Sequence, residues 1–131
     1  EAELVTTPEK EVGRKLLEQF LDDRDIKVRC RAILALYKYD PEKALAKLTL
    51  ISRSMKKENR IHSIRVLGDI ATDRAAELLL EMLNDSEDDV KREAIKEIYK
   101  IHEMEKSELS SSTQNKIESA LEKFKSIWVI K

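Results

Sequence analysis

The sequence predicts an all-α protein made of repeated helix pairs, and three observations support this fold class. A 24-residue stretch, residues 16–39, recurs 62 residues further on as residues 78–101. In both copies the hydrophobic residues follow the three-to-four-residue spacing of one helix face. The chain has 131 residues but only two glycines and two prolines, which leaves little room for the tight turns that join strands. A fixed-period repeat of this kind indicates stacked structural units.

The two copies are closely related, and half of their separation predicts a third copy between them. A shift of 31 residues places Arg60 on Arg29, so a degenerate copy lies midway. This copy is weaker, because Ser54 stands where the outer copies have Asp23 and Asp85. The identical pairs in the outer copies are 16/78, 17/79, 21/83, 23/85, 28/90, 32/94, 33/95, 37/99 and 38/100.

Each copy is expected to form two helices, and the helix starts carry recognisable capping chemistry. A side-chain acceptor before a proline, or before an acidic first turn, is typical of a helix N-terminus. Such signals stand at Thr7-Pro8, Asp40-Pro41, Thr72-Asp73 and Ser86 with Asp89. The expected helices span about 8–22, 25–39, 41–55, 58–71, 73–84, 87–102 and 112–129.

The second helix of each outer copy has a stripe of apolar residues every four positions, which predicts the core. The expected core residues are Val28, Ala32, Leu36, Val90, Ala94 and Ile98. In the last expected helix, Ile117, Ala120, Leu121, Phe124, Ile127 and Trp128 share one face. We expect this helix to cap the stack over Ile95, Ile98 and Tyr99, because the ends of such stacks need a cover. The alternative is a helix that docks onto another domain.

The motif Leu-Leu-x3-Leu-x-Asp-x4-Val-Arg-x2-Ala-Ile-x2-Leu at 16–36 resembles the HEAT repeat. It returns at 78–98 with Lys91 and Ile98 in place of the arginine and the last leucine. The resemblance covers about residues 8–102. It implies a right-handed α-α superhelix within a single domain of residues 1–131, with repeats at about 8–39, 41–71 and 73–102 and a capping helix at about 112–129.

In the HEAT family the aspartate and the arginine form a structural ladder between repeats. By resemblance, the ladder residues here are Asp23, Arg29, Arg60, Asp85 and Lys91. Ser54 interrupts the pattern, which puts the middle repeat's part in the ladder in doubt.

One face of the helix expected at 25–39 is more apolar than a solvated helix face should be. At 100° per residue, Cys30 and Leu34 point away from the side that Ala32 buries. The equivalent stripes in the later copies are polar, apart from Ile61. Either the chain itself covers this face or a partner docks there. The candidate docking stripe is Ile26, Cys30, Leu34, Tyr37 and Ile61.

Charge and composition disfavour several classes of function. The 25 basic and 26 acidic residues give a net charge of −1, which is not a nucleic-acid footprint. Nor is there a continuous basic groove, because Lys27 becomes Glu58 and then Asp89 at the repeat period. No apolar run approaches the roughly 18–20 residues that span a bilayer. The single cysteine excludes an internal disulfide and suits a reducing compartment.

The sequence has no glycine-rich phosphate loop, nucleophile elbow or zinc-ligand spacing. The pair His102-Glu103 resembles the His-Glu pairs of deoxyhypusine hydroxylases, which are iron enzymes built from HEAT repeats. Those enzymes use several pairs, whereas this chain has one, so no metal, cofactor or catalytic residue is expected.

These observations predict a non-catalytic HEAT-repeat scaffold for protein–protein interaction. Because the chain begins with Glu1, we expect it to be a piece of a longer protein. The expected partner is a protein or a neighbouring domain of the same polypeptide, with no nucleic acid and no membrane insertion. We expect a cytoplasmic monomer. Two alternatives remain open: a HEAT-built enzyme of the metal hydroxylase or chromophore lyase type, and a nucleic-acid-binding HEAT-like protein.

Overall fold

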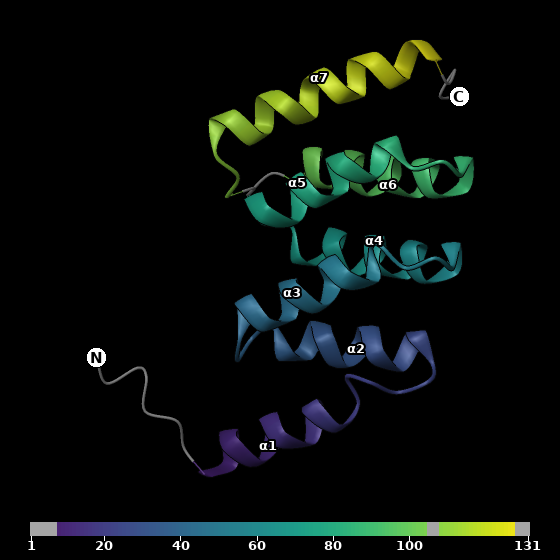
Figure 1. Cartoon of the computed structure of the whole chain (residues 1–131). Helices are drawn as coiled ribbons and strands as arrows, with labels where there is room; N and C mark the ends of the chain where they lie inside the picture. The colour runs from purple at the N-terminus through teal and green to yellow at the C-terminus, as the bar shows by residue number, and fades with distance from the viewer. Residues whose placement is uncertain (1–7, 105–107, 128–131) are drawn as a thin grey trace. The chain divides into compact units, whose positions relative to one another are not determined.

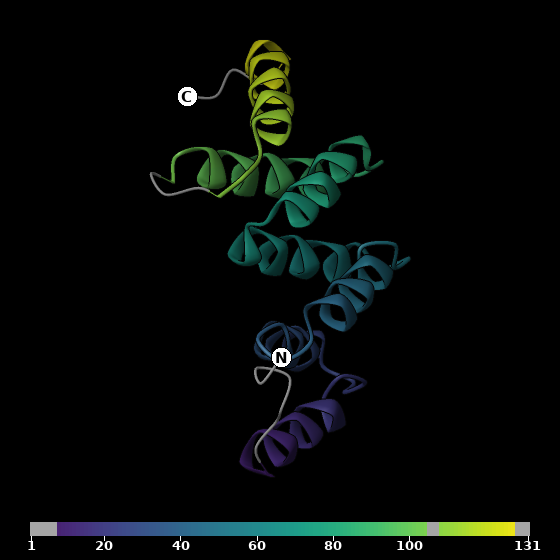
Figure 2. The same ribbon diagram turned by 90° about the vertical axis from the view of Figure 1, so that its left-hand side faces the viewer.

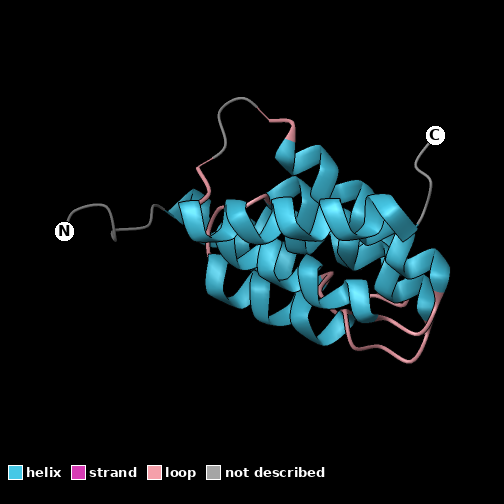
Figure 3. Ribbon diagram, turned by 90° about the horizontal axis from the view of Figure 1, so that it is seen from above, coloured by secondary structure: helices cyan, strands magenta, loops and turns pink. Residues whose placement is uncertain are grey.

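Helices make up all the regular structure that the computed structural model describes, over residues 8–104 and 108–127 (Figures 1 and 3). Over these residues the expected all-α fold class is confirmed. The elements are α1 (Pro8–Gln19), α2 (Ile26–Leu36), α3 (Pro41–Ile51), α4 (Lys57–Ile70), α5 (Asp73–Glu81), the 3-10 helix η2 (Met82–Asn84), α6 (Asp88–His102) and α7 (Ser111–Ile127).

Helices α1, α2 and α3 end three or four residues before the expected boundaries, because their last turns tighten. The Phe20 N–H donates to the Leu17 carbonyl at 2.9 Å, and the Tyr39 N–H donates to the Leu36 carbonyl at 2.8 Å. Both bonds span three residues, which is the spacing of a 3-10 turn. The chain is therefore free to turn back after each short helix.

The chain divides into two compact units, residues 1–48 and residues 49–131, with the boundary inside α3. In the first unit α1 packs against α2. The part of α3 in this unit joins α1 through Lys43 and Glu18, whose Nζ and Oε2 atoms lie 3.0 Å apart. The apolar residues buried in this unit are Leu21, Cys30, Ala32, Ile33, Leu36, Ala44 and Leu48.

In the second unit α4 packs against α5 and α6, and α7 packs against α5 and α6. Figures 1 and 2 show α7 on the side of α5 and α6 that faces away from α4. The fully buried large residues in this unit are Ile64, Leu67, Leu79, Val90, Ile98, Ile101 and Ile117. Ile117 of α7 thus contributes to the same buried layer as α6, as expected of a capping helix.

The expected core is confirmed for Ala32, Leu36, Val90, Ala94 and Ile98, which are all buried. Val28 is half-buried. Tyr99, which we expected under α7, is 54% exposed. That expectation was wrong for Tyr99, because the side of α6 that carries it borders an open groove beside α7, whereas Ile95 and Ile98 are buried. The side chains of Ile127 and Trp128 lie outside the described residues.

Two of the expected helix caps form, and one is replaced. The Lys43 N–H donates to Asp40 at 3.2 Å, and the Ala75 N–H donates to Thr72 at 3.3 Å. Ser86 is not the cap of α6. The residue before that helix is Glu87, whose N–H donates to Asp85 Oδ1 at 2.9 Å. Thr7 lies outside the described residues.

Gly68 lets a buried carboxylate lie against the backbone of α4. A Cβ atom at this position would overlap the Glu97 carboxylate and lie 3.0 Å from the Glu97 Cβ. Glu97 is 7% exposed, and its Oε1 lies 2.7 Å from Lys100 Nζ. The two groups form an ion pair, but their angles are not those of a hydrogen bond, so Oε1 has no hydrogen-bond partner. The close α4–α6 approach therefore depends on a glycine.

Removing a core side chain should cost far more than removing an exposed one. Ile98→Ala should lower the free energy of unfolding by about 2–5 kcal/mol, because it leaves a cavity between α4, α5 and α6. Lys27→Ala, at an exposed position, should change it by no more than about 0.5 kcal/mol. Urea unfolding followed by circular dichroism measures both. Equal effects of the two variants would contradict the assigned core.

Candidate functional site

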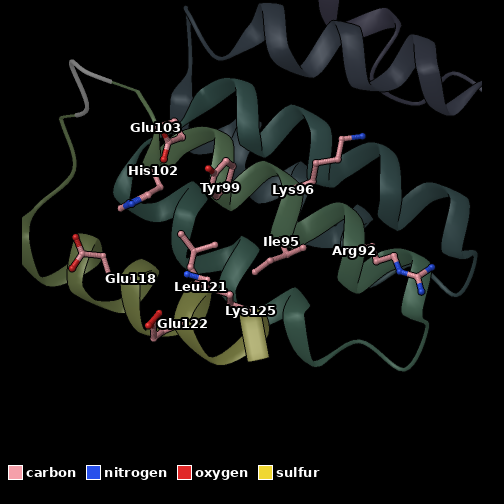
Figure 4. Close-up of a pocket in the computed structure, with 10 residues that line it drawn as sticks. All are labelled: Arg92, Ile95, Lys96, Tyr99, His102, Glu103, Glu118, Leu121, Glu122 and Lys125. Atoms are coloured by element: carbon pink, nitrogen blue, oxygen red, sulfur yellow. The ribbon is translucent and has the colours of Figure 1, made fainter. Parts of the chain in front are cut away.

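A groove of about 950 Å³ runs between α6 and α7 (Figure 4). One wall comes from residues three, four and seven apart on α6, which share a helix face. The other wall comes from Glu118, Leu121, Glu122 and Lys125 on α7. Two helices that cross at an angle touch closely only near the crossing point, so a hollow remains beside it.

The middle of the groove is apolar. Ile95 is 8% exposed and forms part of the floor, and Leu121 of α7 is half-buried. Tyr99, one turn after Ile95 on α6, presents its ring to the same groove beside them. A tyrosine that is more than half exposed beside aliphatic side chains offers apolar area and a hydroxyl to a ligand.

The ends of the groove carry opposite charges. Figure 4 shows Arg92 and Lys96 toward one end, and Glu103, Glu118 and Glu122 toward the other. His102 lies beside Glu103 at the acidic end, and Lys125 lies near Leu121, next to Glu122. The electrostatic potential therefore changes sign along the groove.

The α7 wall is held by hydrogen bonds at its first turn. The Thr113 N–H donates to Ser110 Oγ at 3.2 Å, so Ser110 caps the helix. The Ser110 N–H in turn donates to Asp73 at 2.9 Å, which ties the start of α7 to the first turn of α5. This N–H is the main cause of the lowered pKa of the Asp73 carboxyl. The groove thus has a fixed wall.

The structure brings together two of the expected ladder residues, Arg60 and Asp85. Arg60 Nε lies 2.8 Å from Asp85 Oδ2, and Nη2 lies 3.0 Å from Oδ1, so the pair is bidentate. The two side chains are only 13% and 11% exposed. Arg60 also donates to the Ser54 carbonyl at 2.9 Å, which fixes the turn before α4. Burial by itself would raise the pKa of the Asp85 carboxyl. The hydrogen bonds from Arg60 and the Glu87 N–H, together with the charges of Arg60 and Lys91, outweigh burial, so the pKa is lowered.

Ser54 keeps one function of the aspartates at its repeat position. Asp23, Ser54 and Asp85 each accept a backbone N–H from two residues further on, at 2.9, 3.2 and 2.9 Å. The serine preserves the turn but carries no charge for an arginine. Arg29 stands 25 residues before Ser54, as Arg60 stands before Asp85, and its buried Nε has no hydrogen-bond partner among the described residues. Lys91, the expected ladder residue at the repeat position of Arg60, has its Nζ atom 3.8 Å from Asp88 of the same helix.

The candidate docking stripe contains one buried residue and four half-buried ones. Cys30 is 5% exposed, and its burial raises the thiol pKa to about 11, although the Arg29 charge opposes the shift. Ile26, Leu34 and Tyr37 are half-buried in the first unit, and Ile61 is half-buried in the second. Binding of a partner at this stripe stays a prediction.

Sequence reasoning missed the groove. It treated Tyr99 as part of an ordinary solvated face or as a residue under α7. The identity of Tyr37 and Tyr99 at equivalent positions gave no sign of their different exposure. The shape of the groove depends on the angle at which α7 crosses α6, which local spacing does not encode.

In the described part of the chain no three His, Cys, Asp or Glu side chains are grouped to hold a metal ion. No helix there has the length and apolar character needed to cross a membrane.

A family model of HEAT repeats matches residues 48–111, which run from the end of α3 through α4, α5 and α6 to the first residue of α7. No curated protein matches the chain. One wall of the groove, α6, therefore lies in the matched repeats, and the other wall lies beyond them.

The Arg60–Asp85 pair should make stability depend on pH below neutrality. The folded pKa of Asp85 is lowered, so its contribution is present above the ordinary carboxyl pKa of about 4 and is lost as pH falls through the folded pKa. Asp85→Asn should lower the free energy of unfolding by about 1–3 kcal/mol at pH 7. The difference from the parent should shrink below about pH 4. Asp88→Asn, at an exposed position, is the control; a pH-independent difference for Asp85→Asn would contradict the ionic role.

The burial of Cys30 can be tested by thiol labelling. At pH 8 the native thiol should react about tenfold or more slowly than the same thiol in urea, because the thiolate is scarce and the sulfur is shielded. Leu34→Glu should also destabilise the fold, since it places a charge at a half-buried position among apolar residues. Fast native labelling with a stably folded Leu34→Glu variant would contradict the burial and favour a partner at this stripe.

Proposed function

We propose that this chain, whose residues 48–111 are HEAT repeats, is a non-catalytic scaffold that binds another protein through the α6–α7 groove. HEAT repeats are helical repeat scaffolds that typically mediate protein interaction. The observation that carries the proposal is the exposed Tyr99, which lines the groove beside the buried Ile95 of α6 and the half-buried Leu121 of α7. Tyrosines in such pockets are frequent binding hot spots.

The pairing of surface charges supports a protein partner over nucleic acid. Lys57 Nζ of α4 lies 2.9 Å from Asp89 of α6, and Arg65 Nε of α4 lies 3.0 Å from Glu93 of α6. Two exposed cations on α4 are thus matched by acids on the neighbouring helix. A phosphate backbone requires cations that can release counterions along a continuous track.

The partner is either a separate protein or a neighbouring domain of the same polypeptide. We propose that the chain itself is a monomer. We propose the cytoplasm as its compartment, because the sequence has a single cysteine and suits a reducing environment.

Selection of peptides from a displayed random library tests the proposal. Peptides that bind the parent chain should bind Tyr99→Ala at least about tenfold more weakly, since the variant removes the central anchor. Met55→Ala is the matched control, because Met55 is 96% exposed, belongs to the same unit and lies outside the groove. Thermal melts should show that both variants fold. Recovery of no binders, or of binders indifferent to Tyr99→Ala, would contradict the proposal.

A further inference from the structure

We propose that the occupant of the α6–α7 groove is an amphipathic helix of the partner, with an acidic N-terminal turn against Arg92 and Lys96 and a basic C-terminal turn against Glu118. The inference rests on the proposed function and names the chemistry of the partner. The helical walls favour a helical partner, the apolar centre favours an apolar ridge on it, and the charges at the two ends favour one direction.

The walls require a partner that satisfies its own backbone. Both α6 and α7 use their N–H and C=O groups within their own helices, so neither offers a free edge to an extended peptide. An extended segment would lose water from its backbone groups over the apolar floor without gaining partners. A helix keeps these bonds internal and presents side chains alone, which is the helix-in-groove mode of recognition.

The centre accepts apolar side chains. Ile95, Tyr99 and Leu121 surround it, and the groove volume of about 950 Å³ leaves space for several large side chains. On a helix, residues at i, i+3, i+4 and i+7 form one apolar ridge. Such a ridge, lying along the groove, would cover the exposed face of Tyr99.

The charged ends set the direction of the helix. Arg92 and Lys96 stand one turn apart on α6, both exposed, and the Lys96 side chain is 73% exposed. Its contact with Glu93 is long, at 4.0 Å, so Lys96 can turn toward an incoming carboxylate. The basic end therefore favours acidic residues on the partner.

The opposite end is acidic. Glu118 and Glu122 stand one turn apart on α7, and Glu103 follows the C-terminus of α6, whose dipole adds negative potential. Lys125 stands three residues after Glu122, and its positive charge weakens the negative potential near Glu122. The acidic end is therefore centred on Glu118. A partner helix with acidic first and basic last turns also suits its own dipole. Its direction is then parallel to α6.

Two synthetic peptides test the direction. Both carry the same leucine ridge and the same composition, and side-chain crosslinks equalise their helicity. One has an acidic first turn and a basic last turn, and the other has these turns exchanged. By fluorescence anisotropy, the first should bind at least about fivefold more tightly at low salt, and the gap should narrow at high salt.

Exchange of the groove charges should reverse the preference. The variant with both Lys96→Glu and Glu118→Lys keeps the net charge and should bind the second peptide better. The control variant with both Arg53→Glu and Glu81→Lys changes two exposed residues outside the groove and should keep the parental preference.

The outcomes separate this inference from the proposed function. Equal binding of both peptides, unchanged by the charge exchange but lost in Tyr99→Ala, would overturn the direction and leave the groove a protein-binding site. Library binders that depend on Tyr99 but contain proline throughout would show that the partner segment is not a helix. If no peptide from the library binds the parent chain more tightly than Tyr99→Ala, the proposed function itself is overturned.

Discussion

The close approach of α4 to α6 is the contact on which the second unit depends. Neither helix can bury its apolar face alone, and each contributes fully buried residues to the layer between them, including Ile64, Leu67 and Ile98. Two features hold the approach. Gly68 admits the Glu97 side chain against the α4 backbone, and Arg60 reaches Asp85 just before α6. The first sets the distance between the helices, and the second sets how they are aligned.

The placement of α7 follows from this layer. Once α5 and α6 are aligned, they leave an apolar surface on the side away from α4, and Ile117 covers part of it. The bond from the Ser110 N–H to Asp73 fixes where α7 begins, so its path across α6 is set at one end. Because α7 and α6 do not touch along their whole length, α7 buries Ile117 against this surface and leaves Tyr99 beside an open groove.

Function in a repeat scaffold lies in the surfaces that the stack leaves open. The repeats themselves use charged residues at their repeat positions for packing, as Arg60 and Asp85 show by burying their charges against one another. The α6–α7 groove uses residues outside that pattern, and one of its walls lies beyond the matched repeats. Its apolar centre and opposite end charges favour recognition of a side-chain pattern over that of a phosphate backbone.

The sequence by itself determined the helices, their order and most of the core. These follow from local rules: the apolar spacing predicted that Ala94 and Ile98 are buried, and Asp40 and Thr72 marked helix starts that the structure confirms. Only the tertiary structure decided which apolar residues stay exposed and which polar ones are buried. Tyr99 is open and Glu97 lies inside, although helix periodicity gave no reason for either. The apolar face that carries Cys30 was expected to be covered by the chain or by a partner, and the structure buries Cys30 within the chain. The reason is that spacing along one helix fixes the directions of its side chains, whereas exposure depends on the angle and distance of the helices that pack against it.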